Sequence, residues 1–437
     1  MKNIILRGRI LSFIDSPQIS GNKKSYKYIE DGALLIENGK ITESGTFRKI
    51  TLKKTNKTIV YDHKENLILP GFVDPHIHYP QVQVIGSYAK NLLEWLNKYT
   101  FVEEQKYNNQ KHAERISKLF FDQLINHGTT TASVFCTVNS KSVEAFFKES
   151  HKRNMLMIAG KVMMDRNAPK KLLDTPQSSY DESNFLIKKW HGKGRQKYAI
   201  TPRFAITSSN EQLALTETLL NENPECYFQT HLSENKDEVR LAKKLFPQYR
   251  DYTDIYEKFN FLGPKSLFAH CIYLSNREIK KIGNSKSVLI FCPTSNLFLG
   301  SGMFNLKHYL NKSPKLRLAI ATDIGGGTSY SMLKTMDEAC KISHIQDLMI
   351  NPFQSFYQIT LGNARALSLE HKIGSLSKNN DADIVVLNSK STSAMKLRME
   401  TVKNLAEELF ILQTMGDDRA IKEVYIKGKP SKSGLKL

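Results

Sequence analysis

Two histidines two positions apart, His76 and His78, are the first residues along the chain that suit catalytic chemistry. They follow an apolar run at residues 67–73, and side chains at positions i and i+2 of a strand lie on the same face. Two imidazoles on one face are a natural pair of metal ligands. Two unrelated surface histidines would give the same pattern, so the pair alone does not define a site.

Polar side chains also close three later apolar runs. Each lies at the carboxyl end of its run: His231 in residues 226–232, His270 in residues 266–271, and Asp323 directly after residues 317–322. Any one of them is compatible with a loop residue or a helix cap. Four strand ends that all carry His or Asp are better explained by one shared metal site, because the carboxyl ends of barrel strands meet on one face.

Three histidines and a carboxylate suit zinc or another borderline divalent ion. Such an ion lowers the pKa of a water ligand towards neutrality and so supplies a nucleophile. The chemistry also needs a carboxylate that moves protons. Glu234, three residues after His231, is placed to do so, although it also suits the first turn of a helix. The fourth strand is followed by Arg203 and not by a lysine, so one metal ion is expected rather than two.

Eight apolar runs in the middle of the chain must position these residues. They span residues 67–73, 130–135, 155–162, 197–201, 226–232, 266–271, 287–292 and 317–322. Segments with helical periodicity lie between them, for example residues 113–126, 211–220 and 236–246. Strands that alternate with helices predict βαβ units, and eight units predict an α/β fold of the (β/α)8 TIM-barrel type. Short apolar runs can also be pieces of buried helix, so the count does not exclude other folds.

Both ends of the chain are typical of β-structure. Asn38-Gly39 is a strong hairpin signal within residues 33–42, and residues 383–387 and 424–429 are typical of strands. We expect a small β-sandwich built from both chain ends. The predicted boundaries are 1–66 for the N-terminal part of the sandwich, 67–372 for the barrel, and 373–437 for the C-terminal part, with a helical insertion at 396–415.

The composition of the 437 residues, with 40% hydrophobic and 24% charged residues, excludes a disordered or collagen-like chain. The 63 Lys and Arg against 43 Asp and Glu give a net charge of +20, which is compatible with a nucleic-acid partner. However, the basic residues are scattered, and no nucleic-acid-binding motif accompanies them. We therefore expect a solvated basic surface and no nucleic-acid partner. A catalytically inactive nucleic-acid-binding or scaffold protein is the alternative from another class.

The five cysteines are odd in number, widely spaced and without a C-x-x-C pair, which indicates a reducing compartment. No stretch of 18 apolar residues predicts a transmembrane helix. Arg7, Arg9 and Asp15 interrupt the apolar residues near the N-terminus, which argues against a signal peptide. We expect a cytoplasmic protein with no membrane partner.

Several segments resemble a known family. PGFVDPHIH, HLSEN, SLFAHC and ATD, in this order, resemble the amidohydrolase superfamily of metal-dependent hydrolases. PGFVDPHIHYPQ, TPRFAIT, CPTSNLFLGSG and TDIGGGTSYSML resemble the guanine deaminase family within it. Gln81 and Arg203-Phe204 are the matches that narrow the resemblance from the superfamily to the guanine deaminase family. The resemblance runs from about Asn66 to Ile373.

The resemblance implies a barrel with a sandwich, one zinc ion per chain, a homodimer, and hydrolysis of guanine to xanthine and ammonia. The implied zinc ligands are His76, His78, His231 and Asp323. The implied catalytic residues are Glu234 as proton shuttle, His270 as the residue that stabilises the reacting centre, and Asp323. The implied guanine contacts are Gln81, Arg203 and Phe204, with His231, Glu234 and Asp323 beside them.

The substrate contacts have individual reasons and alternatives. Arg203 can donate to the carbonyl O6 and so select guanine over adenine, and Gln81 can read a ring-nitrogen edge. Phe204 suits both a ring that flanks the purine and a core aromatic. Within enzymes, the alternative is hydrolysis of another aminated heterocycle on the same site, such as an 8-oxopurine, a pterin or a triazine. The Gly-rich segments 296–304 and 325–330 are predicted to be loops at the rim of the site.

Overall fold

The computed structural model of the chain describes residues 3–17 and 23–435. The chain divides into two compact units. One unit contains Met1–Asp74, Asp122–Thr131 and Ser331–Leu437, and the other contains Pro75–Phe121 and Ala132–Tyr330. Within the described ranges, no helix has the length and apolar character needed to cross a membrane.

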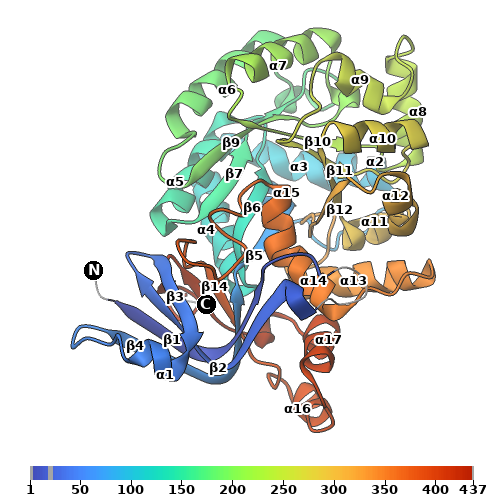
Figure 1. Ribbon diagram of the computed structural model, residues 1–437. Helices are drawn as coiled ribbons and strands as arrows, with labels where there is room; N and C mark the ends of the chain where they lie inside the picture. The colour runs from blue at the N-terminus through green and yellow to red at the C-terminus, as the bar shows by residue number, and fades with distance from the viewer. Residues whose placement is uncertain (1–2, 18–22, 436–437) are drawn as a thin grey trace. The chain divides into compact units, whose positions relative to one another are not determined.

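Eight strands form the barrel sheet and are neighbours in the order in which they occur along the chain (Figure 1). They are β5 (Phe72–His78), β6 (Thr129–Phe135), β7 (Leu156–Gly160), β9 (Gln196–Pro202), β10 (Tyr227–Leu232), β11 (Ser266–His270), β12 (Val288–Phe291) and β13 (Arg317–Ile320). The two-residue strand β8 (Val162–Met163) pairs with β9. Pairing is parallel from β7 to β13. The predicted (β/α)8 architecture is confirmed.

Backbone hydrogen bonds nearly close this sheet into a barrel. After β13, the amide of Asp323 donates to the carbonyl of His76 at 3.0 Å. The amide of His78 in turn donates to the carbonyl of Ile324 at 2.5 Å. The chain beyond the last strand therefore lies directly along the first strand, at the level of the predicted ligands.

Helices separate the barrel strands, as the sequence periodicity predicts. They are α4 (Gln110–Asn126), α5 (Ser140–Arg153), α6 (Pro176–Trp190), α7 (Asn210–Glu222), α8 (Lys236–Leu245), α9 (Tyr252–Lys258), α10 (Asn276–Asn284), α11 (Pro293–Phe298), α12 (Leu306–Lys312) and, after β13, α13 (Met332–Ile345). Capping boxes begin three of them, at Thr175, Asn235 and Ser275. A capping box satisfies backbone N–H groups that have no partner inside the helix, and so it defines where the helix begins.

The predicted extent of the first barrel strand is wrong. The apolar run 67–73 was expected to be the first barrel strand, but its first part belongs to β4 (Ile59–Pro70), which lies in the other sheet. Gly71 separates the two strands, and a Cβ atom there would lie only 2.2 Å from the hydroxyl of Thr130. Two buried strands follow each other with one residue between them, so hydrophobicity alone shows a single run. As a result, His76 and His78 lie within β5 and not beyond its end.

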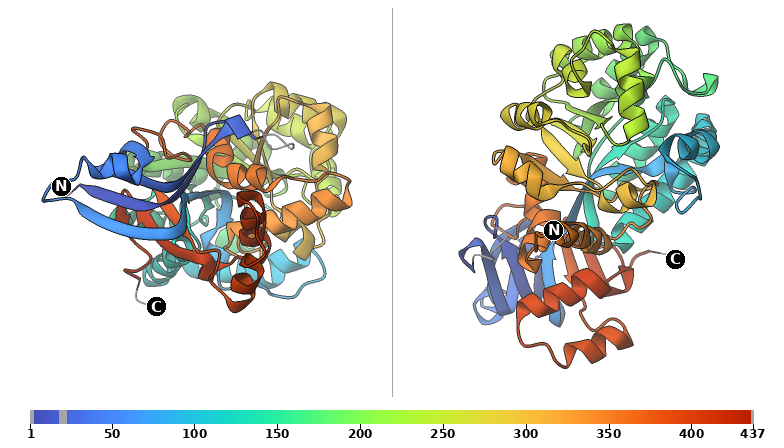
Figure 2. Two further views of the ribbon diagram at one scale, coloured as in Figure 1. Left: turned by 60° about the horizontal axis from the view of Figure 1, so that its bottom comes forward. Right: turned by 90° about the vertical axis from the view of Figure 1, so that its right-hand side faces the viewer.

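The other sheet has seven strands and contains both ends of the chain (Figure 2). Its order is β16 (Lys429–Pro430), β15 (Ile421–Ile426), β14 (Ile384–Leu387), β4, β1 (Ile4–Phe13), β2 (Tyr26–Glu37) and β3 (Lys40–Thr46). The predicted hairpin is confirmed, because Asn38 and Gly39 join β2 to β3 with φ of 53° and 76°, as a type I′ turn requires. The expected union of both chain ends in one β-structure is therefore observed.

The remaining helices are short. They are α1 (Phe47–Thr51), α2 (Leu92–Trp95), α3 (Phe101–Glu104), α14 (Pro352–Tyr357), α15 (Asn363–Ala366), α16 (Ser393–Met399) and α17 (Leu405–Met415). A π-helical turn, Leu96–Thr100, joins α2 to α3. Helices α16 and α17 form the predicted helical insertion between the C-terminal strands.

Replacing Ile68 by alanine is expected to destabilise the seven-stranded sheet. Ile68 lies in the central strand β4 and is fully buried in an apolar cluster with Leu6, Ile10 and Val386. Its truncation leaves a cavity, which costs about 2–5 kcal/mol of unfolding free energy. Thermal unfolding followed by circular dichroism should show a Tm several degrees lower. Leu52→Ala, at a side chain that is 84% exposed, is the control and should have almost no effect.

Candidate active site

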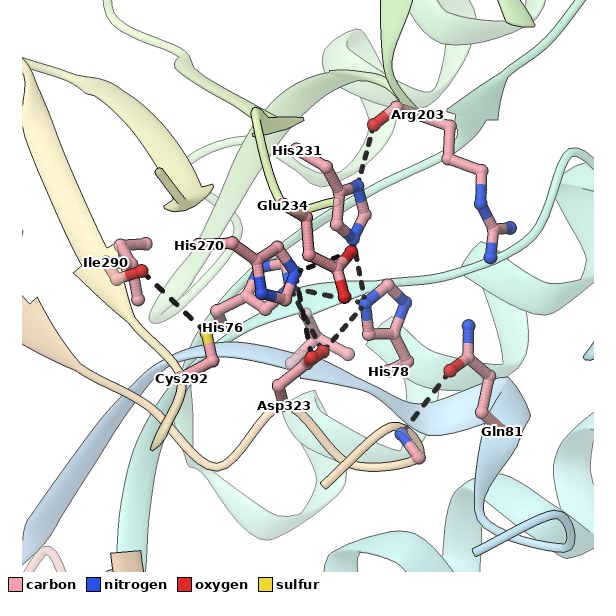
Figure 3. Close-up of polar contacts among 12 residues, drawn as sticks. His76, His78, Gln81, Arg203, His231, Glu234, His270, Ile290, Cys292 and Asp323 are labelled. Atoms are coloured by element: carbon pink, nitrogen blue, oxygen red, sulfur yellow. Dashed lines mark hydrogen bonds and ion pairs between the residues drawn. The ribbon is translucent and has the colours of Figure 1, made fainter. Parts of the chain in front are cut away.

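Four predicted ligands converge at the mouth of the barrel (Figure 3). His76 and His78 come from β5, His231 from β10, and Asp323 from the segment after β13. The Nε2 atom of His78 lies 3.3 Å from the Nε2 atoms of both His76 and His231. The Oδ1 atom of Asp323 lies 3.2 Å from Nε2 of His76 and 3.3 Å from Nε2 of His78. All four side chains are buried.

This geometry fits a single divalent metal ion. Donor atoms at the corners of a tetrahedron with metal bonds of about 2.0–2.1 Å lie about 3.3–3.4 Å from one another. The separations of His78 from His76 and His231, and of Asp323 from His76 and His78, are 3.2–3.3 Å and agree with that expectation. Three imidazoles with one carboxylate are also a donor set that zinc and similar divalent ions accept.

Hydrogen bonds behind the cluster orient its imidazoles. Nδ1 of His231 donates to the carbonyl oxygen of Arg203 at 2.7 Å, so its Nε2 lone pair faces the cluster. Nδ1 of His270 lies 2.9 Å from Oδ1 of Asn296. Nε2 of His270 then faces two carboxylates, 3.4 Å from Oε2 of Glu234 and 3.7 Å from Oδ2 of Asp323. His270 therefore stands beside the cluster, next to both acids.

Three residues at this mouth have left-handed backbone conformations. The φ angles are 51° at Ser233, 69° at His270 and 51° at Asp323. Non-glycine residues adopt this region at a cost of roughly 1–3 kcal/mol each, and they persist only where the surroundings impose it. At His270, the hydroxyl of Tyr309 donates to the carbonyls of the two following residues and holds the turn in place.

Burial, together with the nearby charge of Asp323, raises the pKa of Glu234 to about 8. The hydroxyl of Ser301 donates to Oε1 of Glu234 at 2.8 Å, which opposes the shift and fixes one oxygen of the carboxyl group. In the metal-free protein Glu234 thus holds a proton near neutral pH. A buried acid with a pKa near the working pH is suited to donate and accept protons.

Two of the imidazoles and the carboxylate already have the protonation states that metal binding needs. Burial lowers the pKa of His78 to about 3 and that of His231 well below its usual range. Burial alone would raise the pKa of Asp323, but His76 and His78 hold it well below its usual range. Neutral imidazoles and an ionised carboxylate can bind a cation without first losing protons.

A small pocket opens over the cluster and combines apolar walls with polar groups. Its lining beyond the cluster consists of Gln81, Leu92, Trp95, Leu96, Arg203, Phe204, Glu234, His270, Leu299 and Gly326. Phe204 thus faces the pocket, and its ring centroid lies 6.0 Å from that of His231. Leu299 and Gly326 come from the two Gly-rich segments that were predicted to be rim loops. Every residue proposed from the sequence as a ligand, catalytic group or substrate contact lies in this one region.

Sequence reasoning missed four residues that contact the site. Glu104 accepts hydrogen bonds from Arg203 and Gln81. Asn296 is hydrogen-bonded to His270, and Ser301 donates a hydrogen bond to Glu234. Cys292 places its sulfur within 4.8 Å of the ligand atoms of His76, His270 and Asp323. The sequence shows no spacing pattern for these contacts. Ser301 falls within the predicted loop 296–304, but Asn296 lies in α11, so the first three residues of that segment are helical and not loop.

A second group of possible ligands, His191, Glu225 and Cys226, is poorly suited to a metal ion. The backbone amide of Tyr198 donates to Nδ1 of His191 at 3.1 Å and so uses its lone pair. Burial raises the pKa of the Cys226 thiol to about 12, which keeps it protonated. A substitution in this group is therefore not expected to change the metal content and can serve as a control for the cluster at the barrel mouth.

Known proteins share this fold and much of this sequence. Residues 67–430 match the Amidohydrolase family. The chain belongs to the amidohydrolase family. A family relative, guanine deaminase of Escherichia coli (strain K12), is 44% identical over 422 residues, which cover 96% of each chain. The solved structure of E. coli guanine deaminase has a TM-score of 0.95 at 43% identity and covers 99% of both chains. The crystal structure of guanine deaminase from C. acetobutylicum with bound guanine in the active site has a TM-score of 0.88 at 31% identity, covering 98% of this chain and 99% of that one.

The raised pKa of Glu234 predicts a pH-dependent stability of the chelator-treated protein. Between its ordinary value near 4.5 and about 8, the folded chain holds a proton that the unfolded chain has lost. The free energy of unfolding therefore falls as the pH rises through this interval. Glu234→Gln removes that loss, which is on the order of 5 kcal/mol at pH 8, because each pKa unit between about 4.5 and about 8 corresponds to about 1.4 kcal/mol.

The measurement is the Tm of both proteins between pH 5 and pH 8, in the presence of chelator. The Tm advantage of the variant should grow with pH. Glu370→Gln controls for the loss of a carboxylate at an exposed position. Parallel Tm curves for the wild type and Glu234→Gln would show that Glu234 does not retain the extra proton.

Proposed function

We propose that this chain is a metal-dependent hydrolase that converts guanine and water to xanthine and ammonia. The single observation that carries the proposal is the pocket itself, in which Arg203, Gln81 and Phe204 lie beside three clustered histidines, Asp323 and a proton-holding Glu234. The 44% identical relative carries the name guanine deaminase, and a related structure holds guanine in its active site.

His76, His78, His231 and Asp323 would hold one zinc ion, for which their donor atoms and spacing are suited. When bound, such an ion supplies Lewis-acid chemistry and activates water near neutral pH. The protein contributes the orientation of the ligands and a buried pocket. Oδ2 of Asp323 points towards His270 and can accept a proton from the attacking water.

Glu234 supplies the proton that guanine needs before water can attack it. The C2 carbon of guanine is part of an amidine-like system and is poorly electrophilic while N3 is neutral. A protonated Glu234 can donate to N3 and so prepare C2 for attack by water. The proton taken from the water then goes to the exocyclic amino group, which leaves as ammonia. The remaining hydroxyl proton passes to the Glu234 carboxylate, so that C2 becomes a carbonyl carbon and Glu234 is protonated again. His270, held by Asn296, lies beside both acids and stabilises the charge that develops at the reacting centre.

Arg203, Gln81 and Phe204 would select the base. The guanidinium of Arg203 can donate to the carbonyl O6, which adenine lacks. The amide of Gln81 can read the ring-nitrogen edge, and the ring of Phe204 forms a wall of the pocket.

We also propose a cytoplasmic homodimer without a nucleic-acid partner. The dimer rests on the family resemblance alone, and the absence of nucleic acid rests on the scattered basic residues.

Removal of one ligand tests the metal site. His231→Ala deletes one of four donor atoms, and the affinity for metal should fall far enough that the purified protein loses its ion. Elemental analysis of the wild type should give one zinc per chain. His191→Ala, in the poorly suited group, is the matched control and should keep its metal. Retention of a full equivalent of zinc by His231→Ala would refute the ligand assignment.

Guanine turnover tests the reaction and the role of Glu234. The metal-replete wild type should release ammonia and xanthine from guanine, and a chelator should abolish the activity. Glu234→Gln should keep its metal and lose about 10²–10⁴-fold in kcat, the usual contribution of a proton-transfer group. A panel containing 8-oxopurines, pterins and triazines checks the substrate. Rapid turnover of one of these and none of guanine would overturn the proposed substrate but leave the hydrolase site intact.

A further inference from the structure

Glu104 is a buried acid that contacts the pocket only through two other residues. It ends α3, and 1% of its surface is exposed. Its Oε1 and Oε2 atoms accept from Nη1 of Arg203 at 3.0 and 2.7 Å. Its Oε1 atom also accepts from Nε2 of Gln81 at 2.9 Å. Arg203 and Gln81 line the pocket, and Glu104 lies behind them.

The first consequence concerns charge. Arg203 is 3% exposed, so its guanidinium has lost nearly all contact with bulk water. A buried cation without a partner is unfavourable, and it attracts any anion that can reach it. The carboxylate of Glu104 compensates this charge directly. The pair can therefore offer N–H donors to a ligand without presenting a net positive charge.

The second consequence concerns orientation. A carboxylate only accepts hydrogen bonds, so contact with Glu104 fixes the NH2 group of Gln81 on its own side. The Oε1 atom of Gln81 then faces the other way, 3.4 Å from the backbone amide of Gly325 (Figure 3). Glu104 thus fixes which end of the Gln81 amide is the acceptor, while Arg203 lines the same pocket with N–H donors. This arrangement matches a neutral oxopurine, which carries carbonyl oxygens and N–H groups along one edge.

The substrate and the product of the proposed reaction differ in acidity. Guanine is neutral around neutral pH. Xanthine has a second carbonyl beside its ring N–H groups, which makes it more acidic and partly anionic under the same conditions. An uncompensated Arg203 would bind the anionic product more tightly than the neutral substrate. A compensated Arg203 removes that preference, and so favours the release of product.

We infer that Glu104 is a positioning residue that neutralises Arg203 and orients Gln81, so that the pocket binds neutral guanine in preference to anionic xanthine. This inference rests on the proposed function. It assigns the discrimination between substrate and product to a residue that lies outside the pocket.

The test is Glu104→Gln, which keeps the size of the side chain and removes its charge. Steady-state kinetics between pH 6 and pH 9 should give the KM for guanine and the inhibition constant for xanthine. The ratio of the inhibition constant to KM should fall about tenfold, because a buried charge without its partner binds an opposite charge strongly. The fall should increase as the pH rises and more xanthine becomes anionic. Metal content should stay unchanged.

Asp174→Asn is the matched control, because Asp174 pairs with the buried Lys161 away from the pocket. It should leave the ratio at the wild-type value at every pH. If Glu104 were only structural, KM and the inhibition constant in Glu104→Gln would rise together and their ratio would not depend on pH, which would overturn the inference. Failure of the proposed function is distinguishable, because then the metal-replete wild type would neither turn over guanine nor be inhibited by xanthine.

Discussion

Buried donor atoms of three histidines and Asp323, with separations of 3.2–3.3 Å about His76 and His78, set the conditions for the rest of this structure. Lone pairs turned towards a common point lose their contact with water, and a cation held between them would compensate that loss. The fold holds them there because the ligands come from β5, β10 and the segment after β13. The hydrogen bond from the Asp323 amide to the His76 carbonyl fixes two of them in register. Left-handed conformations at Ser233, His270 and Asp323 complete the arrangement.

The electrostatics of the pocket follow from the same burial. One acid, Glu234, is neutral near pH 7 because burial disfavours its charge, while Asp323 is ionised because imidazoles surround it. Two carboxyl groups in one pocket thus have opposite protonation states, and each suits a different part of a hydrolytic reaction. Glu104, which lies behind the pocket, compensates the positive charge of Arg203. The pocket can therefore combine a proton donor, a proton acceptor and a cationic donor group without a large excess of one charge.

Much of the fold could be predicted from the sequence because the barrel repeats a local pattern. Each barrel strand after the first is a short apolar run between helical segments, and His231, His270 and Asp323 lie at or just after the carboxyl ends of such runs. The first strand was misplaced because β4 and β5 are both buried and only Gly71 separates them. The contacts of Glu104 could not be predicted, since Arg203 lies 99 residues away along the chain. Ser301 lies 67 residues from Glu234, and only the folded loop brings its hydroxyl to that carboxyl group.

The seven-stranded sheet has a consequence for biosynthesis. Strand β4 lies between β1, made early, and β14, which begins at Ile384 and emerges from the ribosome more than 300 residues later. Until then, one side of β4 has unpaired backbone N–H and C=O groups. Such an edge recruits other chains and leads to aggregation, as for any incompletely folded nascent protein. Premature termination anywhere before β14 would leave this edge permanently unpaired. In any such truncated chain, the aggregation-prone strand would lie within the first 70 residues.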